Sequence, residues 1–240
     1  MRLSATALLL SLPLAIAAAP SCEAVSPARL TPVIELYTSE GCSSCPPADR
    51  WLSTLKPLAA AGQAVVQAFH VGYWDYIGWV DRFASPAHTS RQRQIAAANG
   101  LRSIYTPQLV RDGQDWRDYP RALAPAAQPA RAAITLQRKG VDAYEATVTP
   151  AAGVDKWSAY WTVTEHGHAS KVKSGENAGE LLKHDFVVRQ YVPAGDYRGS
   201  ARLSLRTVAP DAAHPRQVNL VVMEPRSGKT LQALSLQCSG

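Results

Sequence analysis

The chain has 240 residues, of which 46% are apolar and 18% are charged. This composition is typical of globular proteins and argues against a disordered, collagenous or coiled-coil chain. Basic residues outnumber acidic ones by 25 to 19, but they are spread along the chain, and the longest block is the pair Arg138-Lys139. The clustered basic surface that nucleic-acid binding requires is missing from this pattern. We therefore expect no nucleic-acid partner.

The N-terminus has the pattern of a secretory signal peptide, predicted over residues 1–21. Arg2 precedes an apolar run from Ala5 to Ala19 that ends in small residues. The run is shorter than the roughly 20 apolar residues that span a bilayer. Later stretches are too polar to anchor the chain. The sequence thus predicts a periplasmic or secreted protein without a transmembrane anchor.

The first half, residues 30–123, alternates short apolar strands with helical patterns. Strands are predicted over 33–37 and 64–69, and Pro46-Pro47 favours a helix start between them. A second helix is expected from residue 85 or 86 to 99, followed by strands over 105–110 and 114–116 that turn at Asp112-Gly113. A short helix over 119–123 completes this part.

The second half has a different organisation. A Pro/Ala-rich stretch, 124–130, is the predicted linker. From 131 to 238 apolar residues alternate in about seven strand-like runs, which is typical of a β-sandwich. Histidines 166, 168 and 184 could be a scattered set of metal ligands, but His166 and His168 have strand spacing beside the turn residue Gly167, which favours exposed loop residues.

Four cysteines fall into two pairs. Cys42 and Cys45 form a C-x-x-C motif, whereas Cys22 and Cys238 lie at the two ends of the mature chain. In an oxidising compartment an even number of cysteines favours disulfides, so a structural Cys22–Cys238 bridge is predicted. Lipidation of Cys22, or its removal with the signal peptide, are the alternatives.

The order of elements, with C-x-x-C after the first strand, resembles the thioredoxin fold. Three segments resemble a bacterial secreted family of unknown function that is described as thioredoxin-like: 33–49 (VIELYTSEGCSSCPPAD), 69–79 (FHVGYWDYIGW) and 103–108 (SIYTPQ). The resemblance continues at 175–179 and 184–189 and so covers nearly the whole mature chain. The predicted fold is an α/β thioredoxin-like domain followed by a β-rich, sandwich-like domain.

The C-x-x-C pair is the candidate catalytic site. A helix start stabilises a thiolate, so Cys42 is the predicted nucleophile, and Cys45 can resolve a mixed disulfide. The resemblance implies that Thr106 and a cis Pro107 lie beside the cysteines and contact substrate. Tyr73 and Trp74 either line a substrate groove or cap the sheet. A zinc site, an inert structural disulfide and a soft-metal site with His70 are the competing interpretations; no metal or cofactor is expected.

Glu35 and His70 are candidate tuning residues. Glu35 is a possible buried proton relay, but it lies seven positions before Cys42, where the alternation of a strand favours the opposite face. A solvated or salt-bridged role is the alternative. His70 ends the second strand and either tunes the site or makes hydrogen bonds in the core.

These features predict a thiol–disulfide oxidoreductase that acts on protein or small-molecule thiols and disulfides. The alternative is a non-catalytic binding or soft-metal-handling protein on a thioredoxin-like scaffold. Whether the protein oxidises, reduces or isomerises depends on its reduction potential, which the residue pattern does not reveal.

Overall fold

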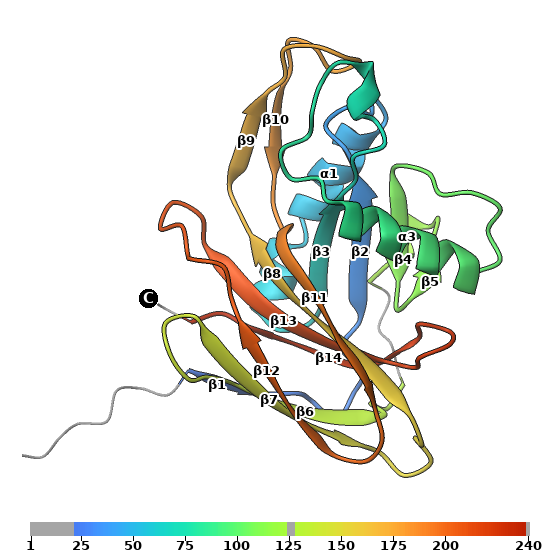
Figure 1. The fold of residues 1–240 in the computed structure, drawn as a ribbon, viewed down its shortest axis with the longest axis vertical. Helices are drawn as coiled ribbons and strands as arrows, with labels where there is room; N and C mark the ends of the chain where they lie inside the picture. Colours follow the sequence, from blue (N-terminus) through green and yellow to red (C-terminus); the bar gives the residue numbers. More distant parts are fainter. Residues whose placement is uncertain (1–21, 124–127, 239–240) are drawn as a thin grey trace, which may run out of the picture.

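The computed structural model describes residues 22–123 and 128–238, which are rich in strands (Figure 1). The predicted signal peptide and part of the predicted linker lie outside the described residues. The elements are, in chain order, β1 (Glu23–Val25), β2 (Val33–Thr38), α1 (Cys45–Ser53), α2 (Lys56–Ala60), β3 (Val65–His70), the 3₁₀ helix η1 (Asp75–Ile77), α3 (Pro86–Ala98), β4 (Gln108–Arg111), β5 (Gln114–Asp115), the 3₁₀ helix η2 (Tyr119–Arg121), β6 (Ala132–Arg138), β7 (Ala143–Pro150), β8 (Trp157–Glu165), β9 (His168–Lys171), β10 (Leu181–His184), β11 (Val187–Tyr197), β12 (Ala201–Arg206), β13 (Arg216–Met223) and β14 (Thr230–Leu236).

One mixed sheet runs through both halves of the chain. Among the described residues it has eight strands, in the order β14-β13-β8-β11-β3-β2-β4-β5. The two halves meet where β11 pairs in parallel with β3 at Val187 and Ala68. Strands β2 and β3 are also parallel, and the other pairs in the sheet are antiparallel.

The predicted fold class is therefore wrong. The described chain is mostly strand with few helices, and its first half does not form an α/β thioredoxin-like domain. Strands β3, β2, β4 and β5 are instead one end of the sheet that β11, β8, β13 and β14 continue. Local sequence patterns could not predict this shared sheet, because the pairing of Val187 with Ala68 joins residues that are far apart in the sequence.

A second sheet, in the order β1-β6-β7-β12, packs on the β14-β13-β8-β11 end of the large sheet (Figure 1). Apolar residues alternate along its strands, so one face of each strand is buried. Leu136 and Val148 from this sheet pack with Trp157, Trp161 and Leu220 from the large sheet in one core. Burial of these side chains holds the two sheets together.

At the other end, helices cover both faces of the large sheet. Ile34 and Leu36 of β2 pack with Leu52 of α1 on one face. The alternate residues Val33 and Tyr37 pack with Ile95 of α3 on the opposite face. This alternation decides which β2 side chains can approach the cysteines at the start of α1.

Strands β8 and β11 are neighbours, with Glu165 at the end of β8 paired with Val187 at the start of β11. The β9–β10 hairpin extends the two strands beyond this pair. The hairpin rises beside α1 at one end of the molecule (Figure 1). It carries the segment 172–180, called the hairpin tip below, to the loop that holds the cysteines. In the described ranges no helix is long and apolar enough to cross a membrane.

Candidate functional site

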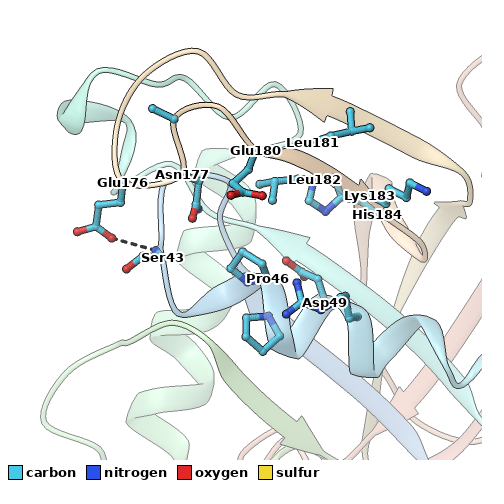
Figure 2. A pocket seen from close by; sticks show the side chains of 13 residues that line it. Ser43, Pro46, Asp49, Glu176, Asn177, Glu180, Leu181, Leu182, Lys183 and His184 are labelled. Atoms are coloured by element: carbon cyan, nitrogen blue, oxygen red, sulfur yellow. Dashed lines mark hydrogen bonds between the residues drawn. The ribbon is translucent and has the colours of Figure 1, made fainter.

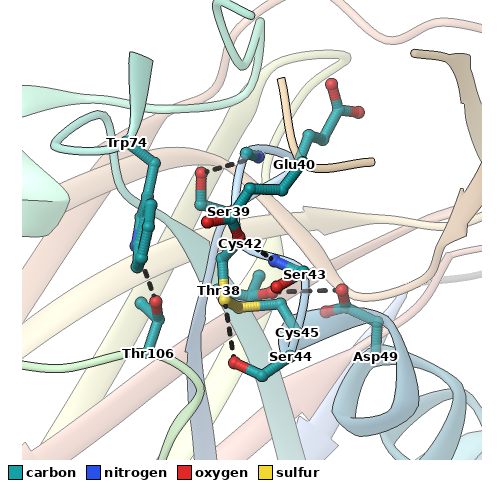
Figure 3. The surroundings of a disulfide bond; sticks show 12 residues. Thr38, Ser39, Glu40, Cys42, Ser43, Ser44, Cys45, Asp49, Trp74 and Thr106 are labelled. Atoms are coloured by element: carbon teal, nitrogen blue, oxygen red, sulfur yellow. Dashed lines mark hydrogen bonds between the residues drawn. A yellow bond between two sulfur atoms is a disulfide. The ribbon is translucent and has the colours of Figure 1, made fainter. Parts of the chain in front are cut away.

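Cys42 and Cys45 are joined by a disulfide at the junction of β2 and α1 (Figure 3). Helix α1 begins at Cys45, with Ser44 as its N-cap, so Cys42 lies in the preceding turn and not at the helix start. The Ser44 Oγ atom is 3.3 Å from Cys42 Sγ. Both cysteines are buried, with exposed fractions of 1% for Cys42 and 0% for Cys45. Ser43 and Ser44, between them, are exposed.

The hairpin tip is attached to the cysteine loop by side-chain hydrogen bonds. The buried Asn177 donates through Nδ2 to the carbonyl oxygens of Glu40, at 2.8 Å, and Cys42, at 3.0 Å. Glu176 Oε2 accepts a hydrogen bond from the amide of Ser43 at 2.9 Å. Residues far apart in the sequence thus close one side of the disulfide.

The opposite side is closed by two of the predicted substrate contacts. Trp74 Nε1 donates to Thr106 Oγ1 at 2.7 Å, beside the disulfide (Figure 3). A Cβ atom at Gly41 would lie 2.9 Å from the Trp74 Cβ atom, so Trp74 packs directly on the cysteine loop. The Thr106–Pro107 peptide bond is cis. The adjacent Tyr73 is half-buried.

A buried carboxyl lies one helical turn after Cys45. Residues i and i+4 share a helix face, which places Asp49 on the same side of α1 as Cys45. Asp49 Oδ2 accepts a hydrogen bond from Thr38 Oγ1 at 3.0 Å (Figure 3). Burial raises the pKa of Asp49 above its usual value, although the nearby imidazoles and the Thr38 hydrogen bond oppose this effect.

Two buried carboxylate–imidazole pairs lie next to this group. His184 Nε2 is 3.1 Å from Glu40 Oε1, and His70 Nδ1 is 2.7 Å from Asp81 Oδ2. The two imidazole rings contact each other, with centroids 4.9 Å apart. Burial by itself raises the pKa of Glu40, but the hydrogen bonds from His184 and Trp79 bring it below its usual value. His70 therefore belongs to the buried polar cluster next to Asp49.

Glu35 lies on the other face of β2. Its carboxylate accepts hydrogen bonds from Arg91 Nη2 at 2.6 Å and Nε at 3.0 Å, and from Tyr160 at 2.9 Å. Tyr37 donates to it at 2.8 Å. The structure thus gives Glu35 the salt-bridged role that was one of its two interpretations.

A pocket of about 480 Å³ opens between α1 and the hairpin (Figure 2). Ser43, Pro46 and Asp49 line it from the cysteine side, and Glu180 and His184 line it from the hairpin side. Figure 2 shows the Asp49 carboxyl and the His184 imidazole on facing walls. Two buried side chains, Asp49 and His184, are thus part of the lining of this pocket.

Within residues 22–123 and 128–238 there is no group of three or more His, Cys, Asp or Glu side chains arranged to hold a metal ion. The second cysteine pair, Cys22 and Cys238, forms a disulfide far from this site, at the ends of the described chain. It packs against the core between the two sheets.

Comparison with known proteins places the chain in a family. A family described as "Protein of unknown function (DUF1223)" matches residues 33–223. The chain belongs to the DUF1223 family. A crystal structure of an Agrobacterium tumefaciens protein is similar, with 26% sequence identity and a TM-score of 0.68, over 88% of this chain and 96% of that one. No curated protein matches the chain significantly.

Several residues of this DUF1223 site were not found from sequence. His184 was predicted to be an exposed loop residue, but its exposed fraction is 3%, because β10 packs against α1. Asn177 and Glu40 lie in segments that carry the family resemblance, 175–179 and 33–49, but neither was named as a site residue. Asp49 could have been found, since the i+4 spacing from Cys45 is visible once a helix is predicted there.

Proposed function

We propose that this DUF1223 protein is a thiol–disulfide oxidoreductase that exchanges disulfides with protein or small-molecule thiols in the periplasm or outside the cell. The observation that carries the proposal is the Cys42–Cys45 pair, which lies at the end of β2 among titratable groups. The two disulfides are compatible with an oxidising compartment.

Cys42 is proposed as the attacking sulfur. It lies in a turn beside the exposed Ser43 and Ser44, whereas Cys45 is inside the first turn of α1 with an exposed fraction of 0%. The Ser44 hydroxyl is close enough to donate to a Cys42 thiolate. When the dithiol form of the enzyme reduces a substrate disulfide, Cys42 S⁻ attacks that disulfide, forms a mixed disulfide and releases one substrate thiolate. Cys45 then attacks Cys42 Sγ, releases the second thiolate and restores the enzyme disulfide.

Substrate access requires movement, because Cys42 is 1% exposed. The Trp74–Thr106 hydrogen bond and the hairpin tip are the contacts that flank it. A substrate thiol or disulfide must displace one of them to bring its sulfur to about 3–3.5 Å from Cys42 Sγ, the separation needed for reaction. Thr106, Tyr73 and Trp74 are accordingly the proposed substrate contacts.

The test is to trap the mixed disulfide. We expect Cys45→Ser to form a stable adduct with a disulfide-containing peptide through Cys42, because the resolving thiol is gone. Cys42→Ser, the matched control, should form little adduct through the buried Cys45. Intact-mass and peptide-map measurements distinguish the two sites. Equal adducts on both variants would contradict the assignment of Cys42.

A further inference from the structure

A buried resolving thiol needs a place for its proton. Cys45 is inside α1 with an exposed fraction of 0%. When it attacks Cys42 it must first become a thiolate, and a free cysteine thiol is mostly protonated at neutral pH. Bulk water does not reach this sulfur, so the acceptor has to be a side chain nearby. Among the described groups, Asp49 is the carboxyl on the same helix face.

We propose that Asp49 takes the proton from Cys45 during resolution, and that the pocket between α1 and the hairpin returns this proton to solvent. The inference rests on the proposed exchange reaction. The mixed disulfide Cys42–S–S–R, the Cys45 thiol and the Asp49 carboxylate give the Cys42–Cys45 disulfide, the leaving thiolate RS⁻ and protonated Asp49. The electron pair of the Cys45 sulfur forms the new S–S bond, the electron pair of the broken Cys42–S–S–R bond leaves with RS⁻, and the balance needs no further reactant.

The geometry supports both parts of this step. Thr38 donates to Asp49 Oδ2 at 3.0 Å and so orients the carboxyl beside the cysteines (Figure 3). Asp49 also lines the pocket, opposite His184 (Figure 2). One buried group therefore connects the interior, where the proton is released, to a cavity large enough for water.

The surroundings make Asp49 a stronger base than an exposed carboxylate. Burial raises its pKa, which increases its proton affinity, while the Thr38 hydrogen bond limits the rise. Three titratable groups change the pKa of Asp49 through their charge: His184 of β10, His70 of β3 and Asp81 of the loop after η1. Asp49 in turn raises the pKa of Tyr119 of η2.

The experiment separates attack from resolution. The protein is reduced at Cys42 and Cys45, with the Cys22–Cys238 bridge verified by mass spectrometry, and mixed rapidly with excess 5,5′-dithiobis(2-nitrobenzoate). The first release of coloured thiolate reports attack by Cys42, and the second reports resolution by Cys45. In Asp49→Asn we expect the second release to slow about 100-fold near neutral pH, within the usual range for general-base catalysis. The first release should stay unchanged.

Two further variants sharpen the result. Thr38→Val keeps the carboxyl but removes a hydrogen bond that lowers its pKa, so the pH midpoint of the second release should rise. This variant also decides the question if Asp49→Asn does not fold. Asp155→Asn, which removes an exposed carboxylate between β7 and β8, outside the lining of this pocket, is the matched control and should leave both releases unchanged.

The outcomes are distinguishable. If the first release is present but the second keeps its rate and pH profile in Asp49→Asn and Thr38→Val, the role of Asp49 is wrong and the exchange function stands. If wild-type protein shows no first release from Cys42, the proposed function itself is wrong.

Discussion

His70 and Asp81 form a buried pair whose charges depend on each other. Their side chains have exposed fractions of 0%, and the Nδ1 and Oδ2 atoms are 2.7 Å apart. Burial by itself raises the pKa of Asp81, but the charge and hydrogen bond of His70 outweigh it and lower this pKa to about 2. Burial likewise disfavours the imidazolium of His70, yet Asp81 raises the His70 pKa above its usual value.

The stability of the protein should therefore depend on pH in two windows. The Asp81 pKa falls from 3.8 to about 2 on folding, which at about 1.4 kcal/mol per pKa unit corresponds to about 2 kcal/mol. This contribution is present above pH 3.8 and is lost as the pH falls toward 2. The contribution of His70 is present below pH 6.5 and is lost as the pH rises through its raised pKa.

Urea unfolding of wild type and His70→Gln from about pH 3 to about pH 9 tests this expectation. The variant should be less stable between the two windows, and its unfolding free energy should change less with pH on both sides. Parallel curves for the two proteins would contradict the pairing.

At the scale of elements, the β9–β10 hairpin links the second half of the chain to the cysteines. Strands β8 and β11 are antiparallel neighbours, and their continuations pair as β9 and β10, with His184 opposite His168. This route brings His184 to Glu40 and carries Asn177 to the carbonyls of Glu40 and Cys42. The hairpin thus contributes both to the polar surroundings and to the burial of the disulfide.

Asn177→Ala should loosen this attachment. The substitution removes two hydrogen bonds and leaves the Glu40 carbonyl without the Asn177 donor, whereas the Cys42 carbonyl keeps its hydrogen bond from the Cys45 amide; we expect an effect of about 1–3 kcal/mol. We expect dithiothreitol to reduce the Cys42–Cys45 disulfide several-fold faster, as measured by quenched alkylation and mass spectrometry. Lys171→Ala, an exposed change on β9, is the control. Equal reduction rates in Asn177→Ala and wild type would show that the hairpin tip does not limit access.

At the scale of the whole molecule, the two ends of the described chain are tied together. Cys22 precedes β1 and Cys238 follows β14, and their disulfide has a sequence separation of 216 residues. A bridge that closes so long a loop restricts the unfolded chain strongly. It lies by the core between the two sheets, away from the site on α1.

Replacing both Cys22 and Cys238 with serine should lower the free energy of unfolding by about 2–5 kcal/mol, the range found when native disulfides are removed. Chemical denaturation measures this change. Trapping of a disulfide peptide through Cys42 should proceed as in the parent protein, because the bridge does not contact the site. Loss of trapping in a variant that remains folded would contradict this separation.

Much of the local structure could be predicted from the residue pattern. The β-prone run 33–37 and the Pro46-Pro47 pair indicated a strand followed by a helix, and these are β2 and α1, although Cys42 was expected at the helix start and lies in the turn before it. The strand alternation also argued against Glu35 as a neighbour of the cysteines, and Glu35 does face Arg91 on the other side of β2. Such features depend on backbone sterics and on side-chain spacing within a few residues.

The shared sheet and the completed site depend on contacts between residues distant in sequence. Val187 pairs with Ala68, and His184 approaches Glu40, only after the second half of the chain has packed against the first. A histidine in a short strand has the same local sequence pattern whether it is exposed or buried. Its burial depends on the element that packs against it, and the residues next to the histidine in the sequence do not reveal that element. The sequence by itself therefore determined the cysteine motif and its flanking elements, whereas tertiary packing decided which distant side chains surround the motif.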